Sequence, residues 1–307
     1  MDEAAARGGD VAAVLRAAGC VFAEDEARLL AAAARTPAEL DALVRRRAGG
    51  APLEHILGWA QFAGLRIGVD DGVFVPRRRT ELLVREGAAH LRRTARARPG
   101  SRTPPVVVDL CCGSGAVGTA LAAVAGPLEL HAADVDPVAV ACARRNVAGV
   151  GGTVHLGDLY AALPSLLLGR VDLLVVNAPY VPSDAVALMP PEARLHEPRT
   201  ALDGGADGLD VHRRVAAGAR RWLVPGGALV LETSVVQAPA SAGALVRHGL
   251  TARVVRDDDL DATAVVGHPV AVRPAVAQPA DVPPVATRTG RHATGGPAPG
   301  QCAAGCG

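Results

Sequence analysis

A short apolar run that ends in an acid and continues into a glycine-rich turn is the feature that most limits how this chain can fold. Val106-Val107-Val108-Asp109 precedes the turn Cys111-Cys112-Gly113-Ser114-Gly115, and Ala116 then opens an apolar helical stretch. Glycine allows a sharp turn and a close approach of a ligand to the backbone, and the amino end of a helix favours an anionic group. The segment therefore predicts a buried strand, a ligand-binding turn and a helix, which together form a unit of a parallel sheet.

The same order of strand and helix repeats toward the C-terminus. Apolar runs predict strands at 105–110, 128–134, 153–156, 171–176 and 227–232, with another near 250–256. Helical spacing predicts helices at 115–125, 137–148 and 207–223, and around 239–248. This alternation predicts an α/β fold with a Rossmann-like, doubly wound parallel sheet, whose ligand lies at the carboxyl ends of the strands.

Periodicity and composition divide the chain into four predicted regions. Apolar residues at helical spacing, and the helix start Thr36-Pro37-Ala38-Glu39, favour helices near the N-terminus. Alternating apolar residues on both sides of Gly64 predict a hairpin, and the last segment is rich in Pro, Gly and Ala without periodicity. The predicted regions are an N-terminal helical domain at 1–55, a β-hairpin linker at 56–75, the Rossmann-like domain at 76–273 and a disordered tail at 274–307.

Composition narrows the classes of protein further. Half of the 307 residues are hydrophobic, which is enough for a sizeable core. All 32 basic residues are arginine, which we attribute to GC-rich coding, and the net charge of +1 gives no argument for a nucleic acid or a membrane. The start of the chain has acids and no apolar stretch, and no run of about 20 apolar residues occurs, so we expect neither a secretory signal nor a transmembrane helix. The six cysteines are scattered, which favours a reduced, cytoplasmic protein without a metal site.

Three acids end three successive predicted strands, at Asp109, Asp134 and Asp158. The glycines at 113, 115 and 118, with Asp134 about twenty residues on, also match the dinucleotide fingerprint, so an NAD-dependent oxidoreductase is one alternative. S-adenosylmethionine is favoured because the Asp109 carboxylate can hold the ammonium group of a methionine moiety, whereas a pyrophosphate is itself negative and would not be bound by a negative charge there. Asp158 could accept from an adenine amino group, and Asp134 would bind ribose hydroxyls in either case. Each acid taken alone could instead cap a helix or lie in a solvated loop.

The tetrapeptide Asn177-Ala178-Pro179-Tyr180 directly follows the strand predicted at 171–176. The Asn177 side-chain oxygen and the Ala178 carbonyl can accept from the two N–H groups of a planar NH2, which would orient a weakly nucleophilic nitrogen. Pro179 holds Ala178 extended and so aims that carbonyl out of the turn, and Tyr180 can cover the flat face of the acceptor. Together with the site predicted for S-adenosylmethionine, the tetrapeptide predicts methyl transfer to a nitrogen that the protein positions against the methyl donor. The same four residues could instead form a simple turn.

These motifs follow one another along the chain in the order found in a known family. In this respect the chain resembles the protein-(glutamine-N5) methyltransferases that modify the Gly-Gly-Gln loop of peptide release factors. The resemblance covers about residues 50 to 273, and two departures stand out: Ala178 replaces the first Pro of the Asn-Pro-Pro-Tyr signature, and Arg78 replaces a Pro of the Pro-Arg-Pro-x-Thr-Glu block. The segments that carry it are 52–58, 74–84, 109–116, Asp134, Asp158, Asn177, Pro179, Tyr180, 196–202 and 204–208.

The resemblance implies S-adenosyl-L-methionine as cofactor, a protein substrate, which would be a release factor, and no direct contact with nucleic acid or membrane. The catalytic residues that it implies are Asn177, Ala178, Pro179 and Tyr180. The implied cofactor-binding residues are Asp109, Cys111, Gly113, Gly115, Asp134, Asp158, Leu159 and Asn177. The candidates on the substrate side are Pro76, Arg77, Thr80, Glu81, Glu197 and Pro198.

Other functions stay open at the level of sequence. The acceptor could be a base amino group in nucleic acid, which would need a flipped base and a recognition domain that we do not find, or another protein or small-molecule nitrogen. A non-catalytic binding module would keep the fold and lose turnover. The nine arginines between Arg77 and Arg102 favour a solvated helix face over a docking face, because no aromatic residues interleave with them.

Overall fold

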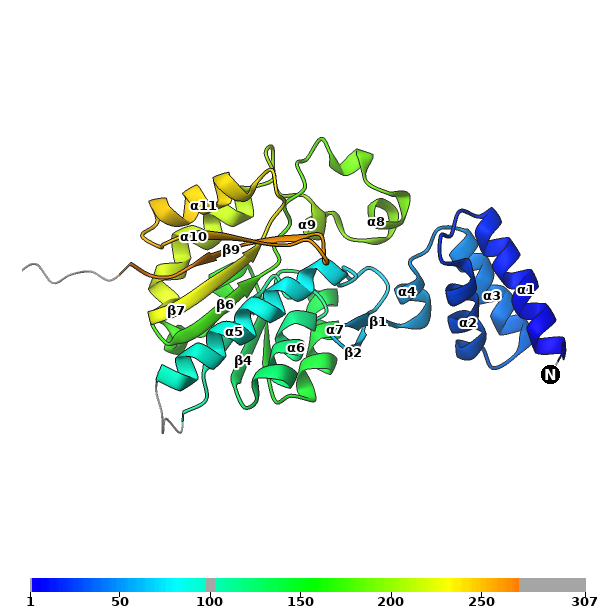
Figure 1. The fold of residues 1–307 in the computed structure, drawn as a ribbon, viewed down its shortest axis with the longest axis horizontal. Coiled ribbons are helices and arrows are strands. Elements are labelled where there is room, and N and C mark those ends of the chain that lie inside the picture. The colour runs from blue at the N-terminus through cyan, green and yellow to red at the C-terminus, as the bar shows by residue number, and fades with distance from the viewer. Residues whose placement is uncertain (1, 98–102, 271–307) are drawn as a thin grey trace, which may run out of the picture. The chain divides into compact units, whose positions relative to one another are not determined.

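The computed structural model describes residues 2–97 and 103–270 (Figure 1). The predicted tail at 274–307, with Cys302 and Cys306, lies outside the described residues. The predicted boundaries at residues 55 and 75 stay predictions.

Four helices form the N-terminal part of the chain, with a core of their own that includes Leu15, Leu30 and Val44. Thr36 caps the third helix as predicted, because its Oγ1 accepts from the Glu39 N–H at 3.2 Å. The helices are α1 (Asp2–Ala17), α2 (Ala23–Ala33), α3 (Pro37–Ala48) and α4 (Leu53–Leu57).

The hairpin is shorter than the sequence predicts. Ile56 belongs to α4 instead of a strand, because its side chain joins the N-terminal core and the left-handed Gly58 ends the helix just before the hairpin. Strands β1 (Trp59–Phe62) and β2 (Leu65–Gly68) then pair antiparallel. Asn146 links this hairpin to helix α7 through two hydrogen bonds. Its Oδ1 accepts from the Gly68 N–H at 2.9 Å, and its Nδ2 donates to the Gly68 carbonyl at 2.8 Å.

A seven-stranded sheet forms the centre of the described residues, in the order β5-β4-β3-β6-β7-β9-β8. The first five strands of this order are parallel, which confirms the predicted doubly wound α/β sheet. Its strands are β3 (Val106–Leu110), β4 (Glu129–Asp134), β5 (Thr153–Leu156), β6 (Val171–Val176), β7 (Leu223–Glu232), β8 (Arg253–Asp257) and β9 (Ala262–Gly267).

At the edge formed by β9 and β8, the sheet differs from the one predicted from the sequence. Strand β9 was not predicted, and it pairs antiparallel with both β7 and β8. It was missed because all six of its residues are buried and most are small, so it shows no alternation of apolar and polar residues. Strand β7 also begins four residues earlier than predicted, at Leu223, with a shift of its register against β6.

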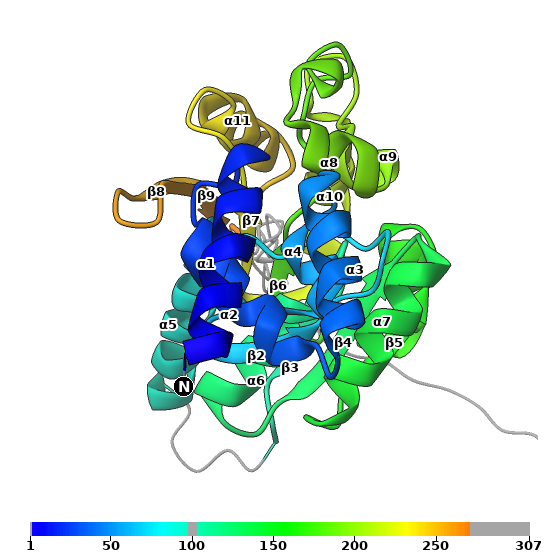
Figure 2. The same ribbon diagram turned by 90° about the vertical axis from the view of Figure 1, so that its right-hand side faces the viewer.

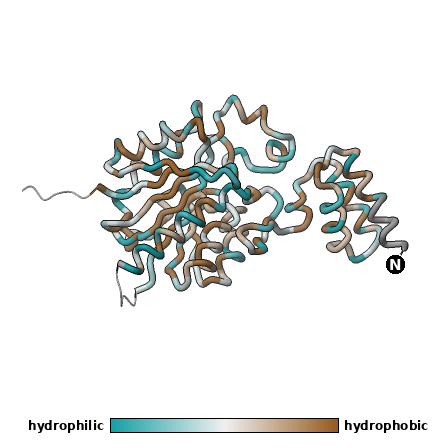
Figure 3. Tube along the Cα trace, in the orientation of Figure 1, coloured by the Kyte–Doolittle hydropathy of each residue, from teal (hydrophilic) through white to brown (hydrophobic). Residues whose placement is uncertain are grey.

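Helices cover both faces of the sheet (Figure 2). Helices α5 (Glu81–Ala97), α6 (Ala116–Ala125) and α7 (Pro137–Ala148) pack on one face, around Leu83, Leu121 and Val140. Helices α10 (Asp210–Trp222) and α11 (Ala238–Arg247) pack on the other, around Val215 and Leu245. Figure 3 shows the hydrophobic colouring along the central strands that these two layers enclose.

The long connection between β6 and α10 carries two short helices, α8 (Pro191–His196) and α9 (Arg199–Leu202). It also carries the segment 204–208, which returns to the end of β6 because the Gly204 N–H donates to the Val181 carbonyl at 2.8 Å. Among the described helices, none is long and apolar enough to cross a membrane.

Candidate active site

A cavity of about 460 Å³ opens at the carboxyl ends of β3, β4 and β6, and the chain order of the sheet reverses between β3 and β6. This is the position at which doubly wound sheets bind their ligands. The cavity unites the two halves that the sequence predicts separately. Of the predicted site residues, those that line it are Asp109, Cys111, Gly113, Asp134, Asp158, Leu159, Asn177, Ala178, Pro179, Tyr180, Pro76, Arg77, Thr80, Glu197 and Pro198.

Gly115 and Glu81 are not among the lining residues. Gly115 shapes the donor turn from behind: its φ is +76°, and a Cβ there would lie 2.9 Å from the Val147 side chain of α7. Glu81 accepts from the Ala63 N–H at 3.1 Å and so supports the hairpin turn.

Asp109 is the last residue but one of β3, and its carboxyl is buried, with the residue only 2% exposed. Its Oδ2 accepts from the Gly118 N–H at 2.8 Å, in the first turns of α6. Burial raises the pKa of Asp109 to about 8, and the neighbouring Asp134 acts in the same direction. A buried acid without a positive partner among the described residues suits a ligand that brings a cation with it.

Asp134 ends β4, and backbone groups hold its carboxyl. Oδ2 accepts from the Gly113 N–H at 2.8 Å, and Oδ1 accepts from the Asp136 N–H at 3.0 Å. Burial raises the pKa of Asp134 while these N–H groups lower it. Each oxygen keeps a second lone pair for a hydroxyl donor, which is the geometry that a ribose diol needs.

Asp158 is exposed, and its Oδ2 accepts from Arg214 Nη2 of α10 at 2.5 Å. Arg214 also lines the cavity, but nothing in the sequence distinguishes it among so many arginines. The next residue, Leu159, is buried at a φ of +46°, and Cys111 on the facing turn has a φ of +57°. Left-handed backbone is rare for such residues and gathers at ligand sites.

These features fit S-adenosylmethionine. Asp109 offers negative charge to a cationic amino-acid end, and Asp134 offers two acceptors to a diol. Leu159 and Val135 offer apolar surface to a flat ring, and the open space beside Gly113 leaves the backbone approachable, since a Cβ there would meet nothing within 4 Å.

Asn177 begins the acceptor half of the cavity, directly after β6. Its Nδ2 donates to Thr80 Oγ1 at 3.3 Å, whereas its Oδ1 has no hydrogen-bond partner among the described residues. The buried Ala178 also makes no hydrogen bond through its N–H or carbonyl within the part of the chain that the structure describes. Both acceptor atoms that the sequence proposes are therefore free to accept.

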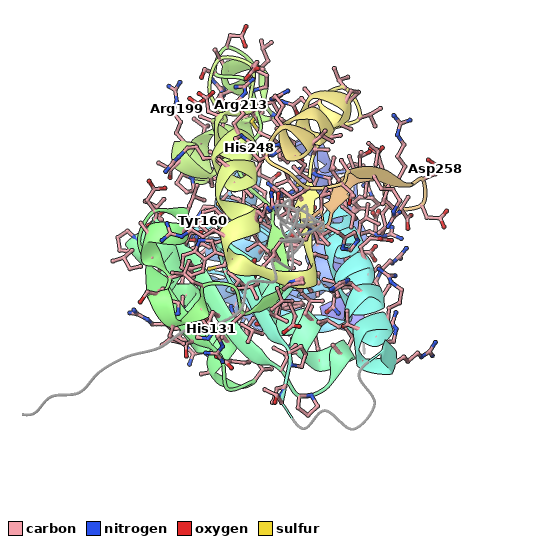
Figure 4. All side chains as sticks on the ribbon, turned by 90° about the vertical axis from the view of Figure 1, so that its left-hand side faces the viewer. His131, Tyr160, Arg199, Arg213, His248 and Asp258 are labelled. Carbon is pink, nitrogen blue, oxygen red and sulfur yellow. The ribbon has the colours of Figure 1, made fainter. Side chains whose placement is uncertain are left out.

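The Tyr180 hydroxyl is held by two residues that the sequence reasoning missed. It donates to Glu232 Oε1 at 3.2 Å and accepts from Arg79 Nε at 3.2 Å. Burial raises the pKa of Tyr180 to about 12. Glu232 could have been found by the rule that selected Asp109, because it too is an acid that closes an apolar strand. The chain's other tyrosine, Tyr160 (Figure 4), stacks on Trp222 and donates to the Val215 carbonyl of α10, so it serves the core.

Glycines of the segment 204–208 let two carbonyls of the acceptor turn pack closely. A Cβ on Gly204 would lie 2.8 Å from the Pro179 carbonyl oxygen, and one on Gly208 would overlap the Tyr180 carbonyl. Gln237 adds a donor to the Tyr180 carbonyl at 2.9 Å. The turn is thus fixed from outside the cavity.

Glu197 fastens the segment around Pro76 to the same wall. Its Oε1 accepts from the Val75 N–H at 3.1 Å and from Arg77 Nη2 at 2.5 Å. Burial raises the pKa of Glu197, and Arg77 lowers it. The Arg77 guanidinium also lies over the Phe74 ring, 5.2 Å from its centroid.

The fold and the cavity define a methyltransferase that uses S-adenosylmethionine. Residues 86–206 match the family model of the methyltransferase small domain. A release factor glutamine methyltransferase of Geobacter sulfurreducens is 38% identical over 236 residues, which are 75% of this chain and 78% of that protein. One of Streptomyces coelicolor is 40% identical over 195 residues, 64% of this chain and 67% of that protein.

A further relative acts on a different acceptor. The 4-amino-L-phenylalanine/4-methylamino-L-phenylalanine methyltransferase of Streptomyces pristinaespiralis is 40% identical over 204 residues, which are 66% of this chain and 68% of that protein.

The chain belongs to the release factor glutamine methyltransferase family. Membership confirms the resemblance and the methyl donor, and it decides against the NAD-dependent oxidoreductase. The roles of individual residues stay predictions.

Proposed function

We propose that this protein transfers a methyl group to the side-chain amide nitrogen of a glutamine in a peptide release factor. One observation carries the proposal: the donor acids and the turn at residues 177–180 line a single cavity. The names of the relatives supply the release factor as the partner. We also propose a cytoplasmic location, where such a partner works, and a separate helical domain at residues 1–55.

When bound, S-adenosylmethionine supplies an electrophilic methyl group on a sulfonium. The chain's own residues would orient the nitrogen that attacks it. Asn177 Oδ1 and the Ala178 carbonyl would accept from the two N–H groups of the glutamine amide, drawing electron density toward nitrogen and fixing the plane of the amide. The tied Tyr180 ring would cover one face of that plane and exclude water.

The donor residues would set the position of the methyl group from the other side. Asp109 would pair with the ammonium end of the donor and Asp134 with its ribose hydroxyls. The turn residues Cys111 and Gly113 would lie against the part of the donor that joins its ammonium end to its ribose. Asp158 and Leu159 would border the adenine.

The direct test is transfer of a radiolabelled methyl group to a panel of acceptors: release factors, ribosomal proteins, tRNA and DNA. Label on a release factor, mapped by mass spectrometry to a glutamine, is the expected result. Label on nucleic acid instead would refute the protein acceptor. The Asn177→Ala variant, which should still bind S-adenosylhomocysteine, shows whether the transfer depends on this cavity.

A free aromatic amine is the second candidate acceptor. It is favoured by the relative named for 4-amino-L-phenylalanine, whose identity to this chain equals that of the Streptomyces coelicolor protein. Ala178, which replaces the signature proline, also changes the part of the cavity that would hold the methyl acceptor. Adding 4-amino-L-phenylalanine to the same panel decides between the two, since only one of them should be methylated at a useful rate.

A further inference from the structure

Arg79 is an arginine of the cavity lining to which the sequence motifs give no role. It lies in the single helical turn Arg78–Thr80 before α5, at position x of the Pro-Arg-Pro-x-Thr-Glu block. Its Nε donates to Glu232 Oε1 and to the Tyr180 hydroxyl, both at 3.2 Å. Its Nη1 and Nη2 make no hydrogen bond within the described residues, and the side chain is 44% exposed. The far end of this guanidinium is therefore available to a ligand in the cavity.

Glu232 holds the guanidinium of Arg79 through its Nε. The acid closes β7, is 2% exposed, and offers the same Oε1 to the Arg79 Nε and to the Tyr180 hydroxyl. The three side chains thus form a triangle of hydrogen bonds, each 3.2 Å long. Burying a carboxylate costs free energy, and the bonds that offset this cost also fix the guanidinium beside the acceptor turn. A guanidinium held through Nε keeps four N–H donors on its far end, in a rigid planar fork.

The charges around Arg79 favour a neutral ligand group over an anion. The Glu232 carboxylate already pairs with the guanidinium, and acids outnumber arginines among the described residues that line the cavity. The other arginines of that lining, Arg77 and Arg214, are each paired with an acid as well. An incoming carboxylate would add to this negative charge, whereas a carbonyl oxygen offers two lone pairs and no charge. A polypeptide carries such carbonyls on both sides of every glutamine.

We infer that Arg79 is a substrate-binding residue whose two NH2 groups donate to a main-chain carbonyl of the polypeptide that carries the methylated glutamine. This contact would hold the backbone of the substrate beside Tyr180, while Asn177 and Ala178 hold the side-chain amide. The inference rests on the proposed function, because it needs a polypeptide as the methyl acceptor. It adds a contact to the main chain, which does not depend on the side chains around the glutamine.

A purely structural role for Arg79 predicts a different result. If Arg79 only neutralises the buried Glu232, its replacement changes folding, turnover and donor affinity together, and the affinity for the acceptor shows no selective change. Arg79→Lys separates the two roles, because the ammonium group keeps the charge and can still pair with Glu232. The lysine side chain ends one atom short of the NH2 groups and has no planar fork, so it cannot reach the carbonyl at the same time.

The first measurement is the KM for a release factor at saturating S-adenosylmethionine. In Arg79→Lys this KM should rise roughly 10- to 100-fold, the scale for hydrogen bonds to a charged group, while kcat and the affinity for S-adenosylhomocysteine stay within about threefold. Arg85→Lys is the matched control and should leave the KM unchanged. Arg85 lies on α5, is 54% exposed and pairs with Asp257 at 2.5 Å, but it does not line the cavity.

An unchanged KM in Arg79→Lys would overturn the inference, and so would a parallel loss of kcat and donor affinity. If Arg79→Lys does not fold, the double variant Arg79→Met/Glu232→Gln takes its place. It removes the arginine together with the buried charge, so no unpaired acid is left in the interior. The same rise in KM is expected there, and an unchanged KM would again overturn the inference.

The second measurement distinguishes a peptide carbonyl from a carboxylate. It compares 4-amino-L-phenylalanine with its amide, which lacks the carboxylate, as acceptors for the wild type and for Arg79→Lys. No preference for the acid is expected in the wild type. A preference of roughly tenfold or more, the scale of a charge-assisted hydrogen bond, that disappears in Arg79→Lys would assign the NH2 groups to a carboxylate and overturn the peptide carbonyl.

The inference and the proposed function fail in different ways. A wild type that methylates no protein refutes the proposed function and this inference together. A wild type that methylates a release factor with the same KM as Arg79→Lys refutes this inference alone.

Discussion

The two halves of the cavity are built in different ways. In the donor half, backbone N–H groups hold the two buried or half-buried carboxyls: Gly118 for Asp109, and Gly113 and Asp136 for Asp134. Only the exposed Asp158 is held there by a side chain, that of Arg214. In the acceptor half, side chains hold one another across the fold, as in the contacts from Thr80 to Asn177 and from Arg79 to Tyr180. The donor half therefore depends on local turn geometry, and the acceptor half depends on tertiary packing.

This difference predicts that substitutions in the two halves have separate effects, one on methyl transfer and the other on the affinity for the methyl donor. Changes in the acceptor half should lower turnover and spare donor affinity, because the backbone that holds the donor is not involved. Changes in the donor half should lower donor affinity first.

The largest effect is expected for Asn177→Ala. It removes one of the two acceptors proposed for the amide, so methyl transfer should fall roughly 100-fold or more, the scale for losing one group of a preorganised polar site. Affinity for S-adenosylhomocysteine, measured by calorimetry, should stay within a few-fold. An equal loss of transfer and of donor affinity would instead show that Asn177 serves the donor.

Asp134→Ala should have the opposite signature. Donor binding should weaken by roughly 1.5–3 kcal/mol, the scale for hydrogen bonds to a charged group. Turnover at saturating donor should change much less. Calorimetric titration with S-adenosylhomocysteine checks the first expectation, and unchanged affinity would mean that the ribose lies elsewhere.

Asp109 should make donor affinity depend on pH. Because burial raises its pKa to about 8, the carboxyl is protonated below that pH and must lose its proton to pair with a cation. Affinity should therefore rise with pH up to about 8, by at most about tenfold per pH unit, and then level off or fall as the ammonium group of the ligand itself titrates. The same linkage means that the free protein loses stability from Asp109 between pH 4 and 8, since the folded form holds the extra proton.

Calorimetry in two buffers of different ionisation enthalpy measures this directly. Near pH 7 the binding of S-adenosylhomocysteine should release protons from the protein. Asp109→Asn should bind the ligand more weakly at pH 8 and show no rise between pH 6 and 8. A wild-type affinity that is flat over this range would contradict the role of Asp109.

The contrast between the halves also explains what the sequence could predict. Asp109, Asp134 and the glycine turn are recognisable because strand, turn and helix follow one another within a few residues. Asn177 and Tyr180 could be predicted from their tetrapeptide, and Glu232 could be noticed as an acid that closes an apolar strand. The contacts of Glu232 and Arg79 with Tyr180 could not be predicted, because no local pattern links segments that far apart. In the fold, the five parallel strands were predictable, whereas β9 was not, since its buried run of small residues lacks a period.

The smallest effect is expected for Ala178→Pro, which restores the signature residue of the family in the acceptor half. The Ala178 N–H makes no hydrogen bond within the described residues, so a proline there breaks none, and it reduces the freedom of the unfolded chain. The free energy of unfolding should rise by about 0.4–1 kcal/mol, with donor affinity unchanged, because backbone N–H groups hold that half. Denaturant titration measures the gain, and Ala185→Pro, in the connection outside the cavity where the N–H donates to the Pro182 carbonyl at 2.9 Å, is the control that should lose stability. A drop in donor affinity in Ala178→Pro would show that the two halves are not independent.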